Sequence, residues 1–353
     1  MHRLFLLLFL LVAANSQAAN HCVILQFHHF SEKTPAVTSI TPKQFDAQLE
    51  YLQQNGFTVM ALSDVALSLK HQLELPEKCV SLTVDDAYIS VYEEAYPRLK
   101  KLGWPLTVFV NTAAVDKGLQ IAMSWDQMRE MSKNGVSFEN HGHQHIHMIR
   151  RNDQETERQW LTRVARDIQT AQRRISREIG IEPTLFAFPY GEYSPPLLSL
   201  IDGMGMTGFG QQSGPVWPDA NMGALPRFPM ADNYANMKGF KTKVQTLPLP
   251  VTRAEPLDPL VRLGEWRPTL KLTLAPRTYS RNNLRCYVGG SDKVDITWSE
   301  TEKDSVSITP QFDLKPGRNR TNCTMPSSQK GRFHWYSHNW FIRNKDGSWY
   351  AEY

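Results

Sequence analysis

The chain has 353 residues, of which 41% are hydrophobic and 21% charged, a composition typical of a soluble globular protein. Its length exceeds the usual size of one domain, so we expect one large domain and one smaller domain. The formal net charge of +4 is small and the basic residues are scattered, so nothing in the charge pattern indicates a nucleic-acid partner.

Residues 1–19 have the pattern of a secretory signal peptide. A basic start at His2 and Arg3 precedes an apolar run over residues 4–12, and small residues follow up to Ala19. The apolar run is short for a bilayer span, and no later stretch reaches about 20 apolar residues. We therefore expect an exported protein, periplasmic or extracellular, with no integral membrane segment after the signal is removed.

Four cysteines fit an oxidising compartment, because their number is even and none has the close spacing of a zinc or redox motif. Cys22 and Cys79 each open an apolar strand, so a disulfide could join them if these strands are neighbours. Cys286 and Cys323 would then form a second disulfide in the C-terminal region.

Predicted strands and helices alternate over the first two thirds of the chain. The expected strands are 23–27, 57–60, 80–84, 105–110, 136–139 and 184–188. The expected helices begin at Thr41-Pro42, Ser63, Tyr92 and Ser124, and a long one carries apolar residues from 161 to 179 before Gly180. This alternation indicates a parallel sheet or barrel.

Polar side chains follow four of these strands. Asp85 and Asp86 follow the strand 80–84, and His28 and His29 follow the strand 23–27. The histidine cluster 141–147 follows the strand 136–139, and the pair Pro189-Tyr190 follows the strand 184–188. Taken alone, the two aspartates could equally cap the next helix. In a closed α/β barrel, however, all four strand ends face one mouth, where such folds keep their chemistry.

The histidine cluster favours a metal site at this mouth. A single histidine is more often structural, but four histidines stand at positions 141, 143, 145 and 147. One carboxylate with two imidazoles, for which we select His141 and His145, leaves coordination positions open for water and substrate. The second carboxylate is then free to act as a base on the attacking water.

Three motifs carry a resemblance to a known family. Residues 83–87 (Thr-Val-Asp-Asp-Ala), 141–145 (His-Gly-His-Gln-His) and 188–191 (Phe-Pro-Tyr-Gly) resemble, in this order, the motifs of the polysaccharide deacetylases, carbohydrate esterase family 4. The resemblance covers roughly residues 22–230. The first strand and the run 186–193 are most similar to the branch that deacetylates poly-β-1,6-N-acetylglucosamine in the biofilm matrix.

The resemblance implies a distorted (β/α)7 barrel that holds a divalent metal, usually zinc and sometimes cobalt or nickel. Asp86, His141 and His145 would bind the metal, and Asp85 would be the general base. The substrate would lie against Pro189 and Tyr190, with the backbone N–H of Tyr190 stabilising the tetrahedral oxyanion.

The chain departs from the family pattern at several positions, of which Val84 in place of Phe and Ala87 in place of Gly are small changes. The usual late histidine, a general acid, has no counterpart in the barrel, and a first-strand histidine, here His28, is thought to replace it in the biofilm branch. Ala187 stands where many members carry an arginine that orients the base, so Asp85 is expected to be less firmly held. Gly142 replaces a serine or threonine whose hydroxyl steadies the loop.

A change of sequence pattern marks the C-terminal part. We expect a barrel over 20–233, a linker over 234–265 and a β-sandwich over 266–353. Its expected strands are 269–274, 284–288, 294–298, 305–309 and 333–343, with a hairpin turn at 344–347 and a returning strand to 353. Six aromatic residues could stack on sugar rings or fill the sandwich core: Trp298, Trp335, Tyr336, Trp340, Trp349 and Tyr350.

The sequence therefore predicts an exported, metal-dependent deacetylase that hydrolyses the N-acetyl groups of a polysaccharide containing N-acetylglucosamine. The first alternative is a catalytically weak or inactive glycan-binding protein. The absence of both the arginine and the late histidine favours it. A non-haem iron oxygenase shares the ligand triad, but its fold is a double-stranded β-helix, which the alternating pattern does not match.

Overall fold

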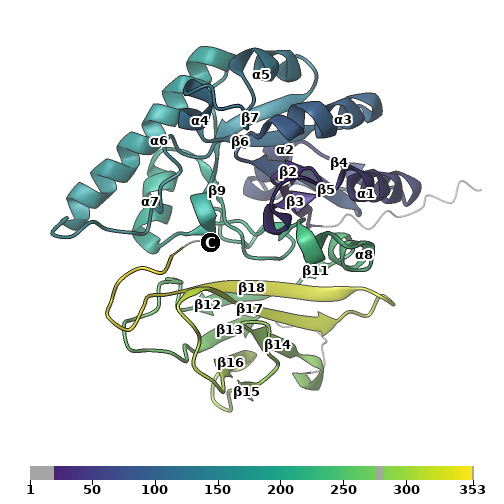
Figure 1. Ribbon diagram of the computed structural model, residues 1–353. Coiled ribbons are helices and arrows are strands. Elements are labelled where there is room, and N and C mark those ends of the chain that lie inside the picture. Colours follow the sequence, from purple (N-terminus) through teal and green to yellow (C-terminus); the bar gives the residue numbers. More distant parts are fainter. Residues whose placement is uncertain (1–19, 276–280, 352–353) are drawn as a thin grey trace, which may run out of the picture.

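The computed structural model describes residues 20–275 and 281–351, which form a barrel and a sandwich packed against each other (Figure 1). The predicted signal peptide, residues 1–19, lies outside the described residues. No helix among the described residues is long and apolar enough to cross a membrane.

The first part is built on one parallel sheet, curled into a half-barrel. Its strand order is β10-β1-β5-β6-β7-β8-β9, and β4 also pairs with β5. The strands are β1 (Val23–Phe27), β4 (Thr58–Val59), β5 (Cys79–Asp85), β6 (Leu106–Val110), β7 (Val136–Asn140), β8 (Leu185–Ala187), β9 (Thr207–Phe209) and β10 (Phe228–Pro229). The predicted distorted barrel is therefore confirmed, and the carboxyl ends of its strands meet at one mouth.

Helices cover the outside of this sheet (Figure 1). They are α1 (Pro42–Gln54), α2 (Leu62–Lys70), α3 (Tyr96–Leu102), α4 (Thr112–Asp116), α5 (Trp125–Ser132), α6 (Glu157–Ile179), α7 (Pro195–Gly203) and α8 (Met237–Val244). A π-helical turn (Val91–Ala95) precedes α3, and two short strands, β2 (His29–Phe30) and β3 (Ser39–Ile40), pair beside the mouth.

Most helix boundaries match their sequence signals. Thr41 caps α1 and Ser124 caps α5, each in a reciprocal capping box, and α6 ends at Gly180 in a left-handed conformation with φ of 82°. The predicted start of α2 at Ser63 is wrong. The N-cap residue is Ala61, two residues before the predicted cap Ser63, and the carbonyl of Ala61 already accepts the N–H of Val65.

The second part is the predicted all-β sandwich, built from two four-stranded sheets. Their orders are β11-β18-β17-β14 and β12-β13-β16-β15. The strands are β11 (Leu247–Pro248), β12 (Val251–Glu255), β13 (Leu270–Leu274), β14 (Arg285–Val288), β15 (Val294–Trp298), β16 (Ser305–Pro310), β17 (Gly317–Pro326) and β18 (Phe333–Ile342).

Three features of the C-terminal part differ from the sequence expectation. The interval 234–265, expected as a linker, contains α8, β11 and β12, and the last of these is an edge strand of the sandwich. Strand β17 was not predicted. The turn at 344–347 forms, but residues 348–351 do not return as a strand; instead the Tyr350 hydroxyl donates to Glu192 of the barrel.

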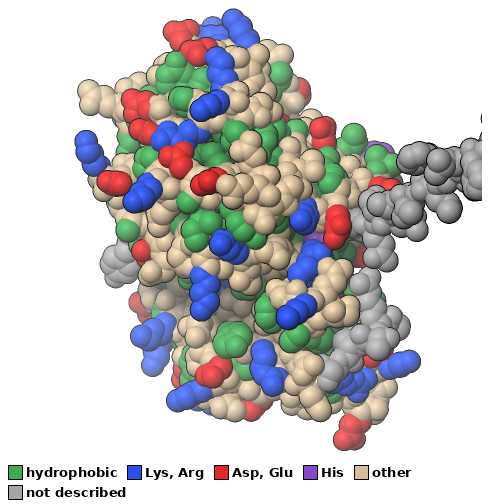
Figure 2. Space-filling view, turned by 90° about the vertical axis from the view of Figure 1, so that its right-hand side faces the viewer, with side chains coloured by type: hydrophobic (Ala, Val, Ile, Leu, Met, Phe, Trp, Pro, Cys, Tyr) green, Lys and Arg blue, Asp and Glu red, His purple; other side chains and the backbone are tan. Residues whose placement is uncertain are grey.

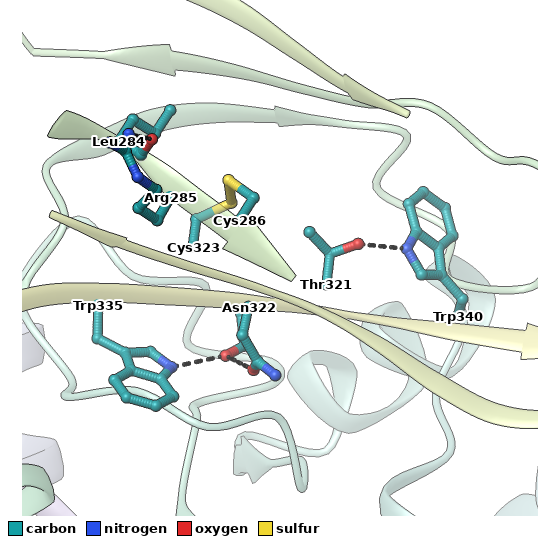
Figure 3. Close-up of a disulfide and its surroundings, with 9 residues drawn as sticks. Leu284, Arg285, Cys286, Thr321, Asn322, Cys323, Trp335 and Trp340 are labelled. Atoms are coloured by element: carbon teal, nitrogen blue, oxygen red, sulfur yellow. Dashed lines mark hydrogen bonds between the residues drawn. A yellow bond between two sulfur atoms is a disulfide. The ribbon is translucent and has the colours of Figure 1, made fainter. Parts of the chain in front are cut away.

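Both expected disulfides are present, Cys22–Cys79 between β1 and β5 and Cys286–Cys323 between β14 and β17. Figure 3 shows the second bridge with two tryptophans nearby. Trp340 is buried and donates to Thr321 Oγ1 at 2.8 Å, whereas Trp335 donates to Ser337 Oγ at 2.9 Å. None of the six aromatic residues is fully exposed, so no row of open aromatic faces exists among them.

Strand β18 lies along the barrel and carries much of the contact between the two parts (Figure 1). The ring of Trp335 packs at 5.4 Å from that of Phe228 in β10, and the Asn339 amide donates to Gln212 at 3.3 Å. On the face shown in Figure 2, basic and acidic side chains are interspersed over both parts, with no patch of a single sign.

Candidate active site

Asp85 and Asp86 lie at the mouth of the barrel, and neither caps a helix. Asp85 is the last residue of β5, and the next helical turn begins at Val91 with Ser90 as its N-cap residue. Asp85 is completely buried, and Asp86 is 8% exposed. The helix-cap interpretation of these two carboxylates is therefore wrong, and their position at a strand end is as predicted.

Asp86, His141 and His145 form a compact group of ligand atoms, all within 4.8 Å of one another. Asp86 Oδ1 lies 3.2 Å from His145 Nε2 and 3.7 Å from His141 Nε2. The Asn111 amide also donates to Asp86 Oδ1 at 2.7 Å, which orients this carboxylate. A carboxylate and two imidazoles at this spacing suit a divalent metal with open coordination positions.

The environment of His141 favours the neutral ligand form. Burial lowers its pKa to about 4, and its Nδ1 lies 2.7 Å from the carbonyl oxygen of Ala187. Because a carbonyl only accepts, Nδ1 carries the proton and the lone pair of Nε2 points toward Asp86. The chemistry of the donor set therefore fits a divalent metal ion.

Asp85 is held by two partners that the sequence does not reveal. Arg227 donates to both carboxylate oxygens, at 2.7 and 2.9 Å, and the Gln26 amide donates at 2.6 Å. Burial alone would raise the pKa of Asp85, but the Arg227 guanidinium, itself fully buried, holds it below the usual range. Arg227 thus orients Asp85 in place of the arginine that many family members carry at the position of Ala187.

His28 lies half-buried between β1 and β2, at the same mouth. It is close enough to Asp85 and Asp86 for its charge to lower the pKa of both carboxyl groups. Its neighbour His29 is buried and stacks on Tyr88, with ring centroids 3.6 Å apart. Of the two histidines, His28 is the more exposed at the mouth.

Tyr190 is fixed from several sides. Its ring stacks on that of His147, with centroids 3.7 Å apart and planes 9° from parallel, and lies 4.5 Å from the His145 ring. Its carbonyl accepts from Arg318 of β17 at 2.8 Å. Glu192, completely buried, accepts from His147 Nδ1 at 2.8 Å and from Tyr350 at 2.5 Å. The sandwich therefore supplies two side chains to this loop.

The loop after β7 compensates for the glycine at position 142. Asp167 of α6 accepts the N–H groups of His143 and Gln144 at 2.8 and 3.0 Å. A Cβ on Gly142 would lie only 2.8 Å from Asp167 Oδ2, so the carboxylate occupies the space that a serine or threonine would need. The loop is steadied by Asp167 in place of a hydroxyl.

Backbone conformation marks the same residues. Asp86, Ala87, His145 and Tyr190 have positive φ of 74°, 54°, 53° and 59°, which non-glycine residues rarely adopt. Such backbone persists only where the surroundings impose it, and it concentrates at functional sites.

Residues 72–209 match the family model of polysaccharide deacetylases. A putative polysaccharide deacetylase of Bacillus subtilis, YxkH, is 26% identical over 205 residues, covering 58% of this chain and 69% of that protein. A poly-β-1,6-N-acetyl-D-glucosamine N-deacetylase of Staphylococcus aureus is 26% identical over 201 residues, covering 55% and 69%.

Solved structures with the same fold include the deacetylase PplD of Streptococcus pyogenes and IcaB from Ammonifex degensii. Each superposes with a TM-score of 0.56 at 23% identity and is covered over 98% of its length, against 64% and 65% of this chain. The matched region contains the Asp85-Asp86 pair and the histidine cluster. Residues 72–209 therefore form a polysaccharide deacetylase domain, and the named relatives that match it include enzymes that hydrolyse N-acetyl groups.

Proposed function

We propose that this chain is an exported, metal-dependent enzyme that removes N-acetyl groups from a polysaccharide containing N-acetylglucosamine. The observation that carries the proposal is the juxtaposition of two different sites: the cluster of Asp86, His141 and His145, and an ionised Asp85 fixed beside it by Arg227. The relative named as a poly-β-1,6-N-acetyl-D-glucosamine N-deacetylase supports the substrate class. The two disulfides support export into an oxidising compartment.

Asp86, His141 and His145 would hold the metal, which supplies Lewis acidity toward the amide oxygen and its attacking water. Asp85 accepts a proton from this water as its oxygen bonds to the amide carbon. The N–H of Tyr190 donates to the oxyanion of the tetrahedral intermediate. His28 then gives a proton to the leaving nitrogen as the C–N bond breaks, so that acetate and a free amine are released.

An inactive glycan-binding protein is not favoured. That alternative rested on the alanine at position 187 and on the lack of a late histidine. Arg227 contacts Asp85 with two hydrogen bonds, and His28 stands at the mouth.

Acetate release tests the proposal. The metal-free chain is supplied in turn with zinc, cobalt and nickel and offered β-1,6-linked and β-1,4-linked N-acetylglucosamine oligomers. We expect acetate with at least one metal, and none after chelation. Absence of acetate from every combination, or an active enzyme without bound metal, would contradict the proposal.

Two substitutions separate the roles of the aspartates. Asp86→Ala is expected to lose both metal and activity. Asp85→Asn should keep the metal but lose about 10²-fold or more of its turnover, because the proton acceptor is removed. Asp292→Asn, an exposed position in the sandwich, is the matched control and should resemble the wild type. Equal turnover in Asp85→Asn and the wild type would exclude Asp85 as the base.

A further inference from the structure

A cavity of about 410 Å³ lies at the junction of barrel and sandwich. The barrel contributes Tyr193 and residues between 212 and 226 to its wall, and the sandwich contributes residues of β12 and β18. Asp85, Asp86 and the histidine cluster 141–147 are not among the lining residues, so the cavity is separate from the candidate active site. Its volume falls in the range of small-molecule sites.

The lining combines aromatic surface with uncharged polar groups. Trp217, Trp335 and Tyr336 contribute rings, and burial raises the pKa of the Tyr336 and Tyr193 phenols, which therefore stay neutral. Burial lowers the pKa of His338 to about 4, so this imidazole is neutral as well.

Charged groups line the cavity only where it meets solvent. Asp219 and Arg253 are both exposed, and no other charged residue belongs to the lining among the described residues. A buried anion or cation would find no partner inside, and a wholly apolar chain would leave the polar groups unsatisfied.

One buried group beside the cavity lacks a partner. His338 is 4% exposed and lines the cavity, and its Nε2 makes no hydrogen bond to any described residue. Buried nitrogen atoms of this kind are normally satisfied, so an unpaired one indicates a water or ligand hydroxyl.

We propose that this cavity binds an uncharged hexose unit. A sugar ring presents apolar C–H faces, which pack on aromatic rings, and hydroxyl groups, which would pair with His338 and the phenols. The ligand class is argued from the lining alone; that the hexose belongs to the polysaccharide being deacetylated rests on the proposed function. The junction would then hold the polymer at a second point, away from the reaction.

Binding is measured on the full chain carrying Asp86→Ala, without metal, so that turnover cannot interfere. The probes are N-acetylglucosamine oligomers of two to six units, titrated by calorimetry. Trp217→Ala removes a half-exposed ring at the cavity, and His338→Gln keeps a polar group of similar size. Tyr287→Ala, an exposed ring on β14 outside the cavity, is the control.

We expect saturable binding that weakens at least tenfold in Trp217→Ala and in His338→Gln and is unchanged in Tyr287→Ala. Thermal unfolding identifies any variant that is not folded, and Trp217→Ala, whose ring is partly in solvent, then decides. Unchanged affinity in a folded Trp217→Ala variant, or no binding at all, would overturn the inference.

The outcome is distinguishable from that of the proposed function. Oligomer binding that depends on Trp217, in a chain whose wild type releases no acetate, would support the hexose site and contradict the deacetylase. Acetate release by a chain whose Trp217→Ala variant binds oligomers normally would support the deacetylase and contradict the hexose site.

Discussion

Two neighbouring carboxylates have different chemistry here because their partners differ. Asp85 is paired with a guanidinium and an amide, whereas Asp86 faces two imidazole nitrogens and the Asn111 amide. The first carboxylate is held ionised and oriented, and the second has the geometry of a metal ligand. The difference between these adjacent aspartates thus follows from their environments, since the residue type is the same.

The buried pair of Arg227 and Asp85 is predicted to contribute to both stability and activity. Arg227→Ala leaves a completely buried carboxylate without its cation, so we expect the free energy of unfolding to fall by about 3–5 kcal/mol. Activity should fall sharply, while bound metal is retained in the folded protein.

Urea unfolding, metal analysis and acetate release measure the three effects of Arg227→Ala. Arg227→Lys keeps the charge but not the two-pronged contact, and an intermediate result is expected. Arg173→Ala, at an exposed position of α6, is the control. A loss of stability below about 1 kcal/mol would show that the pair is not the anchor of Asp85.

At the scale of elements, prediction succeeded where the signal is local. The apolar spacing and the terminal glycine of α6 lie within one segment, and the alternation of strands and helices fixes the barrel. Strand β17 was missed because its sequence has no apolar alternation: it buries Thr321, Cys323 and Met325, while arginines on its other face contact the barrel.

The residues that hold the active-site side chains in place were not predictable from the sequence, for a related reason. Arg227 contacts Asp85 across 142 positions, Arg318 contacts Tyr190 across 128, and Tyr350 contacts Glu192 across 158. A motif identifies residues that are adjacent in sequence, but it carries no information on such partners. The candidate metal ligands could be found from a histidine cluster, whereas the partners of Asp85, Tyr190 and Glu192 required the fold.

The loop 189–192 is predicted to depend on the sandwich. Tyr350→Phe removes the hydroxyl that donates to Glu192, and Glu192 in turn fixes His147 against the Tyr190 ring. We expect kcat to fall about tenfold, with little change in KM or bound metal, because the Tyr190 N–H, the proposed oxyanion donor, is less well held. Steady-state kinetics measure this split. The control is Tyr287→Phe, an exposed ring; equal kcat in both variants would remove Tyr350 from the positioning network.

At the scale of the whole molecule, the sandwich is part of the enzyme rather than an appended module. Its strand β18 packs on the barrel, Arg318 and Tyr350 reach the Tyr190 loop, and the cavity is lined by both parts. A continuous interface of packed rings and hydrogen bonds couples the stability of two parts, because neither can open without exposing the other.

We therefore predict that barrel and sandwich unfold together. Hydrogen exchange should give the slowest amides of β5 and of β16 the same opening free energy. Trp335→Ala removes the ring that packs on Phe228 and should lower both values by about 1–3 kcal/mol, since a partly buried ring is lost. Tyr287→Ala should lower neither. If Trp335→Ala accelerated exchange in β16 alone, the two parts would be independent, and the sandwich could not be what holds the active-site loop in place.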